Sequence, residues 1–182
     1  MADEELMGLV ATLDADAFSV LYDRHITAAY SLAYRIVGGQ SLADDATQAA
    51  FLSVWRSAER YDSRRGSVRS WILSIAHNRA IDLLRRATRH SDRRAGGEIE
   101  EAERLPAGDD TEAAAIQAVE ADGTRSLLNV LPDGQRRVVE LSFYSGYSHT
   151  EIATLLEVPL GTIKGRIRRA LDRLRDELVA IP

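Results

Sequence analysis

Apolar positions near the start of the chain recur every three or four residues, which is the period of an amphipathic helix. The longest such pattern begins near Asp16 and stops at Gly38 and Gly39, a pair typical of a helix C-terminus. It predicts one long helix, and its apolar and aromatic side chains are core candidates: Phe18, Leu21, Tyr22, Ile26, Ala29, Tyr30, Ala33, Tyr34 and Val37.

Two further helices are predicted after the long one. Ser41 can open the first of them, and Asp44 and Asp45 would lie near the positive end of its dipole. Its apolar positions are Phe51, Val54 and Trp55. Ser67 can cap the next helix, which follows an arginine-rich loop containing Gly66. The apolar face of that helix consists of Val68, Trp71, Ile72, Ile75, Ala76 and Leu83 or Leu84.

A change in composition separates these helices from the rest of the chain. Residues 88–122 contain glycines, a proline and many acidic residues, and they show no sustained amphipathic pattern before Glu112. We interpret this segment as an acidic linker that is flexible at least as far as Pro106. Residues 113–119 are expected to form a helical lead-in to a second module.

The second module is predicted to contain four short helices. Apolar stripes on either side of residues 131–132 predict the first two, the second of which is expected to end at Gly146. Ser148 and Glu151 have the spacing of a capping box and start a third helix. Residues 158–161 (VPLG) interrupt the pattern before a fourth. The last two helices therefore match the spacing of a helix-turn-helix.

The final predicted helix has one apolar stripe and one cationic face. The stripe consists of Ile163, Ile167, Ala170, Leu171 and Leu174, and the cations are Lys164, Arg166, Arg168, Arg169, Arg173 and Arg175. A cationic helix face can simply be solvated, but the capped helix and tight turn before it favour DNA binding in a major groove. Glu157 stands where many such turns carry a glycine with positive φ.

Charge is distributed unevenly over the 182 residues. The 23 Lys and Arg against 28 Asp and Glu give a net charge of -5. Positive residues nevertheless concentrate in residues 56–94 and 136–175, and negative residues concentrate in 98–120. We therefore expect an all-α protein of two small helical domains. A three-helix domain at 1–87 and a four-helix, helix-turn-helix domain at 123–182 would be joined by the linker at 88–122.

Several classes of function are disfavoured. The chain has no cysteine, and its four histidines are scattered, so we expect no metal site and no cofactor. The adjacent acids Asp44 and Asp45 diverge by about 100° on a helix, and no nucleophile or phosphate loop is identified, so we expect no enzyme. The acidic N-terminus and the absence of a membrane-length apolar run predict a cytoplasmic protein without membrane insertion. The histidines are His25, His77, His90 and His149.

Motifs in both modules, taken in order, resemble those of the extracytoplasmic-function (ECF) sigma factors, which are specificity subunits of bacterial RNA polymerase. The motifs are DDATQAAF at 44–51, WI at 71–72, IAHN at 75–78, DLLRR at 82–86, LP at 131–132, EIA at 151–153 and GTIKGR at 161–166. The resemblance extends over nearly all of the chain from Phe18 to Leu178. It implies that the protein binds core polymerase, recognises a two-part promoter and promotes DNA melting.

The resemblance assigns three groups of residues. Those implied to bind the core polymerase, at its beta-prime clamp, are Asp44, Asp45, Gln48, Phe51 and Trp55, although Phe51 and Trp55 equally fit a core position. The loop from Tyr61 to Ser67 and the helix that begins at Val68 are implied at the downstream promoter element, with these residues: Arg64, Arg65, Ser67, Arg69, Trp71, Asn78, Arg79, Arg85 and Arg86. Asn78 lies four residues before Asp82, and a pair at this spacing more often forms a local structural hydrogen bond than reads a base. Those implied at the upstream element are Thr162, Lys164, Arg166, Arg168 and Arg169. The beta flap of the polymerase and an anti-sigma factor are further implied partners.

Two other functions remain open at this point. A dimeric helix-turn-helix regulator would bind duplex DNA specifically without polymerase and would use two half-sites. An interaction protein that sequesters partners would keep its function after the charges of the last helix are removed. The basic third helix and the lack of a ligand-pocket signature count against the regulator.

Overall fold

The computed structural model describes residues 1–95 and 128–180, and the side chains of residues 1–89 and 128–177. Every regular element within these ranges is helical, which confirms the all-α prediction. The chain divides into two compact units, Met1–Ala107 and Gly108–Pro182. No helix in the described ranges is long and apolar enough to cross a membrane.

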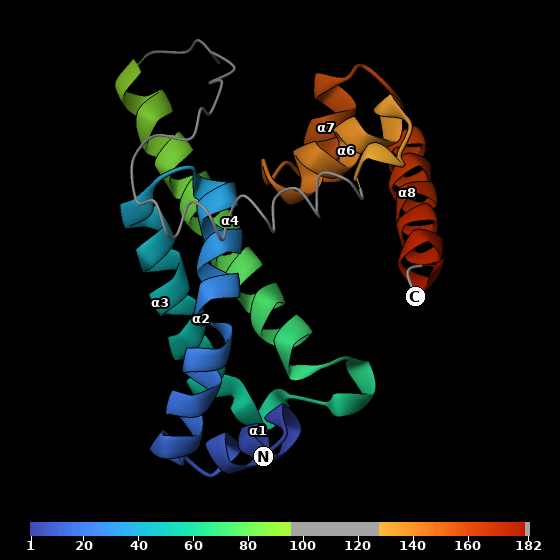
Figure 1. Cartoon of the computed structure of the whole chain (residues 1–182). Coiled ribbons are helices and arrows are strands. Elements are labelled where there is room, and N and C mark those ends of the chain that lie inside the picture. The colour runs from blue at the N-terminus through green and yellow to red at the C-terminus, as the bar shows by residue number, and fades with distance from the viewer. Residues whose placement is uncertain (96–127, 181–182) are drawn as a thin grey trace. The chain divides into compact units, whose positions relative to one another are not determined.

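Three long helices form the body of the N-terminal unit: α2 (Ala15–Val37), α3 (Gln40–Ser57) and α4 (Val68–Ala95). Each of them packs against the other two (Figure 1). The ends of α2 are fixed by caps, since Asp14 accepts a hydrogen bond from the Ala17 N–H at 2.9 Å and Gly38 adopts a left-handed φ of 71°. The long helix predicted from the sequence is therefore confirmed.

The starts of α3 and α4 differ in how well the sequence predicts them. The prediction that Ser41 opens α3 is wrong, because Gly39 is the N-cap and the helix begins one residue later. Ser67 does cap α4, since its hydroxyl accepts a hydrogen bond from the Ser70 N–H at 3.2 Å. At its other end α4 continues to Ala95, beyond residue 88 where we expected the linker to begin. Nothing in the intervening residues breaks a helix before Gly96.

A short helix that the hydrophobic pattern did not predict, α1 (Asp3–Ala11), precedes this bundle. It packs mainly against α2 and against the short 3-10 helix η1 (Ala58–Arg60), which is followed by a second one, η2 (Ser63–Arg65) (Figure 1). Its buried side chains belong to one core with all three long helices. The buried members of that core are Leu6, Met7, Val10, Ala17, Leu21, Ala29, Ala50, Phe51, Val54, Ala58, Val68, Ile72 and Ala76.

One carboxylate fastens α1 to α2. The Arg24 guanidinium donates to the Asp3 carboxylate at 2.7 Å, and His25 Nε2 lies 2.6 Å from its other oxygen. Desolvation by burial raises the pKa of Asp3, but the hydrogen bonds and charges of His25 and Arg24 outweigh it and hold the pKa below 3.8. The ionised carboxylate is thus the stable form in the folded protein.

The C-terminal unit contains α6 (Asp133–Phe143), α7 (His149–Leu155) and α8 (Leu160–Ala180). The predicted capping box is confirmed, since Ser148 accepts from the Glu151 N–H at 3.3 Å and Glu151 accepts from the Ser148 N–H at 2.6 Å. Helix α6 ends at Phe143 and not at Gly146, which lies in the following turn with φ 72°. The buried core of the unit consists of Val138, Leu141, Ile152 and Ile163.

Two further features of this unit bear on the sequence predictions. Glu157, in the turn between α7 and α8, adopts a left-handed φ of 53°, the conformation that favours glycine. Leu171 is 52% exposed, so its placement in the apolar stripe of α8 is wrong. The helical lead-in expected at 113–119 lies outside the described residues, as does the expected linker from residue 96 onwards.

The carboxylate between α1 and α2 yields a prediction about stability. Replacing Asp3 by Asn should lower the free energy of unfolding by about 1 to 2 kcal/mol at neutral pH, because two charge-assisted hydrogen bonds are lost. Because the pKa of Asp3 is lowered in the folded protein, its ionised carboxylate stabilises the fold at pH values above the ordinary pKa of 3.8. This stabilisation is lost as the pH falls through the pKa that Asp3 has in the folded protein. The deficit measured by urea titration should therefore shrink below about pH 4. Asp23→Asn, an exposed change on α2, is the control, and an equal loss in both variants would contradict the assignment.

Candidate nucleic-acid interface

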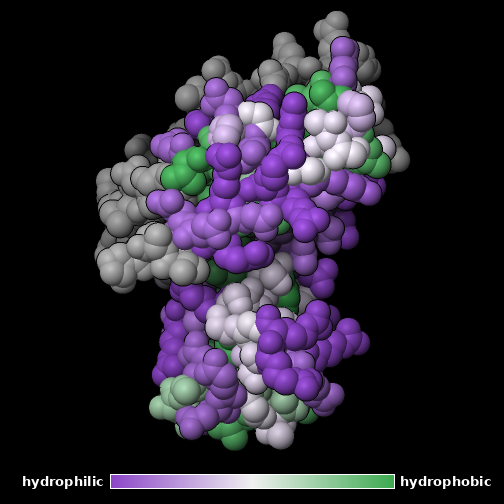
Figure 2. All heavy atoms as spheres, turned by 90° about the vertical axis from the view of Figure 1, so that its right-hand side faces the viewer, coloured by the Kyte–Doolittle hydropathy of each residue, from purple (hydrophilic) through white to green (hydrophobic). Residues whose placement is uncertain are grey.

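The first half of α8 carries three exposed cations, Lys164, Arg168 and Arg169, and the exposed Arg173 and Arg175 follow further along the helix. Ile163 and Ala170 are completely buried, which fixes the rotation of the helix about its axis. Hydrophilic side chains accordingly predominate on the side of this unit shown in Figure 2. The structure thus presents a cationic helix surface, in the second position of a helix-turn-helix, that can enter a major groove.

Two of the residues implied at the upstream element, Thr162 and Arg166, are only half-exposed. The guanidinium carbon of Arg166 lies 3.7 Å from the position that a β-carbon on Gly134 would occupy, in the first turn of α6. The Arg166 side chain therefore packs across α6, which holds α8 against that helix. Arg169 lies along its own helix over Gly165 and stays exposed, so it is the better placed of the two arginines to reach DNA.

A second surface lies on α3. Asp44, Asp45 and Gln48 are exposed there, as a protein-binding surface requires. Phe51, which the resemblance implied as part of this surface, is only 3% exposed and belongs to the core. Trp55 is half-buried, with its ring 5.1 Å from that of Phe18. Phe51 therefore supports this surface from beneath and does not form part of it.

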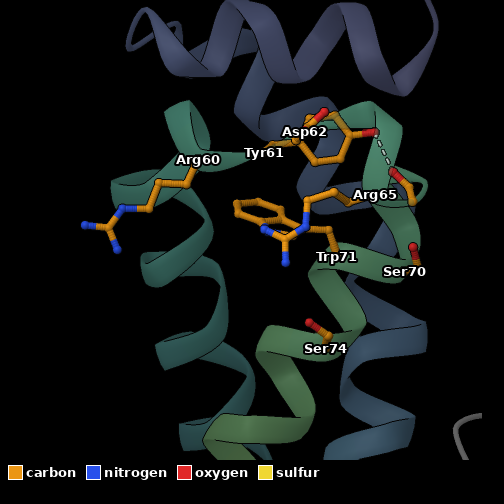
Figure 3. A pocket seen from close by; sticks show the side chains of 8 residues that line it. Arg60, Tyr61, Asp62, Arg65, Ser70, Trp71 and Ser74 are labelled. Carbon is orange, nitrogen blue, oxygen red and sulfur yellow. Dashed lines mark hydrogen bonds between the residues drawn. The ribbon is translucent and has the colours of Figure 1, made fainter.

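A pocket of about 380 Å³ opens where α4 begins (Figure 3). Its aromatic members are Trp71 and Tyr61, whose rings meet edge to face with centroids 5.7 Å apart. The Arg65 side chain reaches toward Trp71, whereas Arg60 extends away from the two rings. The residues that line the pocket are Arg60, Tyr61, Asp62, Arg65, Gly66, Ser70, Trp71 and Ser74. An unpaired nucleotide could bind here, because its base can stack on the aromatic rings and hydrogen-bond to the hydroxyl groups while a cation neutralises its phosphate.

The loop that forms the wall of this pocket is held by its own hydrogen bonds. The Tyr61 hydroxyl donates to the Gly66 carbonyl at 3.0 Å (Figure 3), and Asp62 accepts from the Arg64 N–H and guanidinium. These hydrogen bonds from Arg64 lower the pKa of Asp62. Gly66 has φ 150°, and a β-carbon there would lie 2.9 Å from the Ser70 hydroxyl. Only glycine fits this position without a shift, so the loop has a defined shape.

The other residues implied at the downstream element are placed unequally. Arg79 donates from Nε and Nη2 to the Ser53 hydroxyl at 3.1 and 2.8 Å, so it links α4 to α3. Arg64 is paired with Asp62. The remaining members are exposed, apart from the half-buried Trp71: Arg65, Ser67, Arg69, Asn78, Arg85 and Arg86. Within the described part of the chain, no cluster of His, Cys, Asp or Glu could hold a metal ion.

Sequence reasoning missed several residues that line the pocket, among them Ser70 and Ser74. A signal for the two serines was present, because residues 70, 71 and 74 share one side of a helix whose positions 68, 72 and 76 are apolar. Nothing in the sequence placed Tyr61 against Trp71, since that contact depends on how the loop folds back onto α4.

Family models match both units of the chain. Sigma-70 region 2 matches residues 21–90, which include the pocket and the exposed face of α3, and Sigma-70 region 4 matches residues 127–176, which include most of α8. The ECF RNA polymerase sigma factor SigK of Mycobacterium tuberculosis (strain ATCC 25618 / H37Rv) is 35% identical over 175 residues, covering 95% of this chain and 91% of the relative. SigK of Mycobacterium ulcerans is 34% identical, with 96% and 92% covered.

Two solved structures are also similar. Rhodobacter sphaeroides SigE in complex with the anti-sigma ChrR is 30% identical, with 97% of this chain and 98% of that chain covered and a TM-score of 0.45. CnrH in complex with the cytosolic domain of CnrY is 28% identical, with both chains fully covered (100%) and a TM-score of 0.44. The two region matches and the 35% identity to SigK confirm the resemblance seen in the motifs. The chain belongs to the ECF RNA polymerase sigma factors.

Proposed function

We propose that this sigma factor reads its promoter with two surfaces: the exposed cations of α8 on the upstream duplex, and the Trp71 pocket on an unpaired base downstream. The observation that carries the proposal is the presence, in one chain, of a cationic recognition helix and an aromatic pocket large enough for a nucleotide. A protein that binds only duplex DNA does not need such a pocket, because the bases of a duplex stay paired and stacked. The dimeric-regulator alternative leaves it unexplained.

At the upstream element, Lys164, Arg168 and Arg169 supply the contacts from α8 to phosphates and base edges. Arg166 acts indirectly, because its side chain packs on α6 at Gly134 and sets the position of α8. Thr162, half-exposed near the start of the helix, lies where recognition helices commonly approach the bases.

At the downstream element, the extruded base stacks on Trp71 and hydrogen-bonds to the hydroxyl groups of the pocket. Arg65 and the exposed Arg69 neutralise the adjacent phosphates. Extruding one base costs a few kcal/mol, which stacking and hydrogen bonds in the pocket offset. The factor thus melts DNA by binding the open form more tightly than the duplex, without any bond being cleaved.

Core RNA polymerase completes the mechanism. Asp44, Asp45 and Gln48 on α3 form the surface for the beta-prime clamp, and the C-terminal unit would meet the beta flap. We assign residues 1–87 to clamp and downstream binding, residues 88–122 to the connection and residues 123–182 to upstream binding. A long connection gives the two units a low effective concentration for one another until the polymerase fixes their separation. We further propose that the protein acts in the cytoplasm, where the polymerase is, and that it uses no cofactor.

An anti-sigma factor is the proposed inhibitor. Apolar side chains are exposed in both units: Leu52 at 52% in the first, and Leu155 at 50% and Phe143 at 40% in the second. Exposed apolar groups of this kind suit a protein partner that covers them while polymerase is absent.

Run-off transcription tests the proposed function. With bacterial core polymerase and a pool of promoter fragments, the protein should direct initiation from a subset that shares a two-part element. Trp71→Ala should abolish initiation from duplex templates and restore part of it on templates with a premelted bubble, because the base no longer has to be captured. A protein that binds these fragments but never redirects polymerase is a regulator and not a functional sigma factor.

The two arginines of α8 should behave differently. Arg169→Ala should weaken upstream-element binding by the holoenzyme by about 1 to 3 kcal/mol, with relaxed specificity if it reads a base. Arg166→Ala should instead lower the thermal stability of the protein, because it removes packing across α6. Binding isotherms over a salt series and thermal melts measure both effects. Arg173→Ala, exposed further along α8, is the control, and matching profiles for all three variants would refute the division.

The inhibitor is tested in the native host. The tagged protein should copurify under non-inducing conditions with a stoichiometric partner other than polymerase, and Leu155→Asp together with Leu52→Asp should release it. Recovery of the protein alone or only with polymerase would refute the anti-sigma proposal while leaving the promoter-reading proposal intact.

A further inference from the structure

Helix α1 lies outside the residues matched by the Sigma-70 region 2 model, which begin at position 21. It nevertheless shares a core with α2, α3 and α4, and it contacts η1. The loop that forms the wall of the Trp71 pocket, called the base pocket below, begins at η1. A second hollow of about 570 Å³ lies between α1 and this loop. Four residues of α1 at helical spacing form one side of it: Glu4, Met7, Gly8 and Ala11.

Three loop residues, Arg60, Tyr61 and Asp62, line both this hollow and the base pocket. They are therefore a thin wall that separates the two. On the pocket side, Tyr61 meets Trp71 edge to face and donates to the Gly66 carbonyl. On the other side the wall faces α1.

The position of this wall depends on α1. Tyr61 packs against the hydrophobic core that contains Met7 and Ala58. Partial desolvation and the negative charges of Glu4, Asp62 and Asp3 raise the pKa of Tyr61. Helix α1 itself is fastened to α2 through the Asp3 contacts with Arg24 and His25. The pocket wall thus has a fixed support that does not involve DNA.

We infer that α1 is a positioning element of the base pocket: through Met7 and Tyr61 it holds the pocket wall in place before an unpaired base arrives. A wall that is already ordered loses less conformational freedom on binding, so the base is captured with higher affinity. The inference rests on the proposed capture of a base in the Trp71 pocket. Its own claim is that a helix outside the matched region contributes to that capture.

A thermodynamic cycle with an abasic nucleotide tests the role of Tyr61. Holoenzyme binding is measured on fork-junction DNA with a single-stranded downstream element, either intact or lacking the base at one position. Tyr61→Phe keeps the ring and removes the hydrogen bond to Gly66. It should weaken binding to intact forks by about two- to tenfold and leave binding to the matching abasic fork unchanged. Tyr22→Phe, which removes an exposed hydroxyl from α2, should change neither.

The contribution of α1 is tested with two buried residues of the same helix. Met7 and Leu6 are 1% and 2% exposed, but only Met7 lines the hollow. Both Met7→Ala and Leu6→Ala should lower the melting temperature. At a temperature where both variants are folded, only Met7→Ala should reduce the preference for the intact fork. Equal preference in the two variants would overturn the inference.

These experiments distinguish a failure of the inference about α1 from a failure of the proposed base capture. If the unmodified holoenzyme binds intact and abasic forks equally at every downstream position, base capture itself fails. If it prefers one intact fork, and Tyr61→Phe and Met7→Ala both retain the full preference, capture stands and the role of α1 is refuted.

Discussion

The burial of successive turns at the start of α4 is the constraint on which the N-terminal unit depends. Val68, Ile72 and Ala76 are fully buried in a core built from all four helices, so α4 can neither rotate nor slide without exposing them. That burial directs Ser70, Trp71 and Ser74 toward the pocket. Hydrophobic packing beneath the pocket therefore fixes the geometry of the side chains that line it.

The C-terminal unit follows the same logic with a smaller core. Its central cluster has four buried residues, and Ile163 is the member that comes from the recognition helix. Ile163, the buried Ala170 and the Arg166 contact over Gly134 set how α8 projects from the unit. Glu157 accepts a left-handed backbone in the turn between the two helices, which costs about 1 kcal/mol relative to glycine. The turn geometry is thus imposed by the helices that it joins.

Periodicity predicted α2, α3, α4, α6, α7 and α8 because their apolar residues recur over several turns or follow a recognisable cap, although it misplaced the start of α3 and the end of α6. It missed α1, where Leu6, Met7 and Val10 have helical spacing but the helix has only nine residues. The site was harder to predict. The exposed cations on α8 follow from its amphipathic pattern. The burial of Phe51 depends instead on contacts between helices, and the hydrogen bond from Arg79 to Ser53 joins residues 26 positions apart. One-dimensional patterns carry no information about such pairings.

Helix α4 has 28 residues, and at 1.5 Å per residue it spans about 42 Å. Trp71 lies near its start, and the exposed Arg85 and Arg86 lie about 22 Å further along the same rod. With paired DNA rising 3.4 Å per step, that separation corresponds to about six base pairs. A continuous helix does not stretch, so under the proposed capture of a base the two arginines would stay at a fixed distance from the pocket, and their spacing would set the length of DNA between the extruded base and any phosphates they contact.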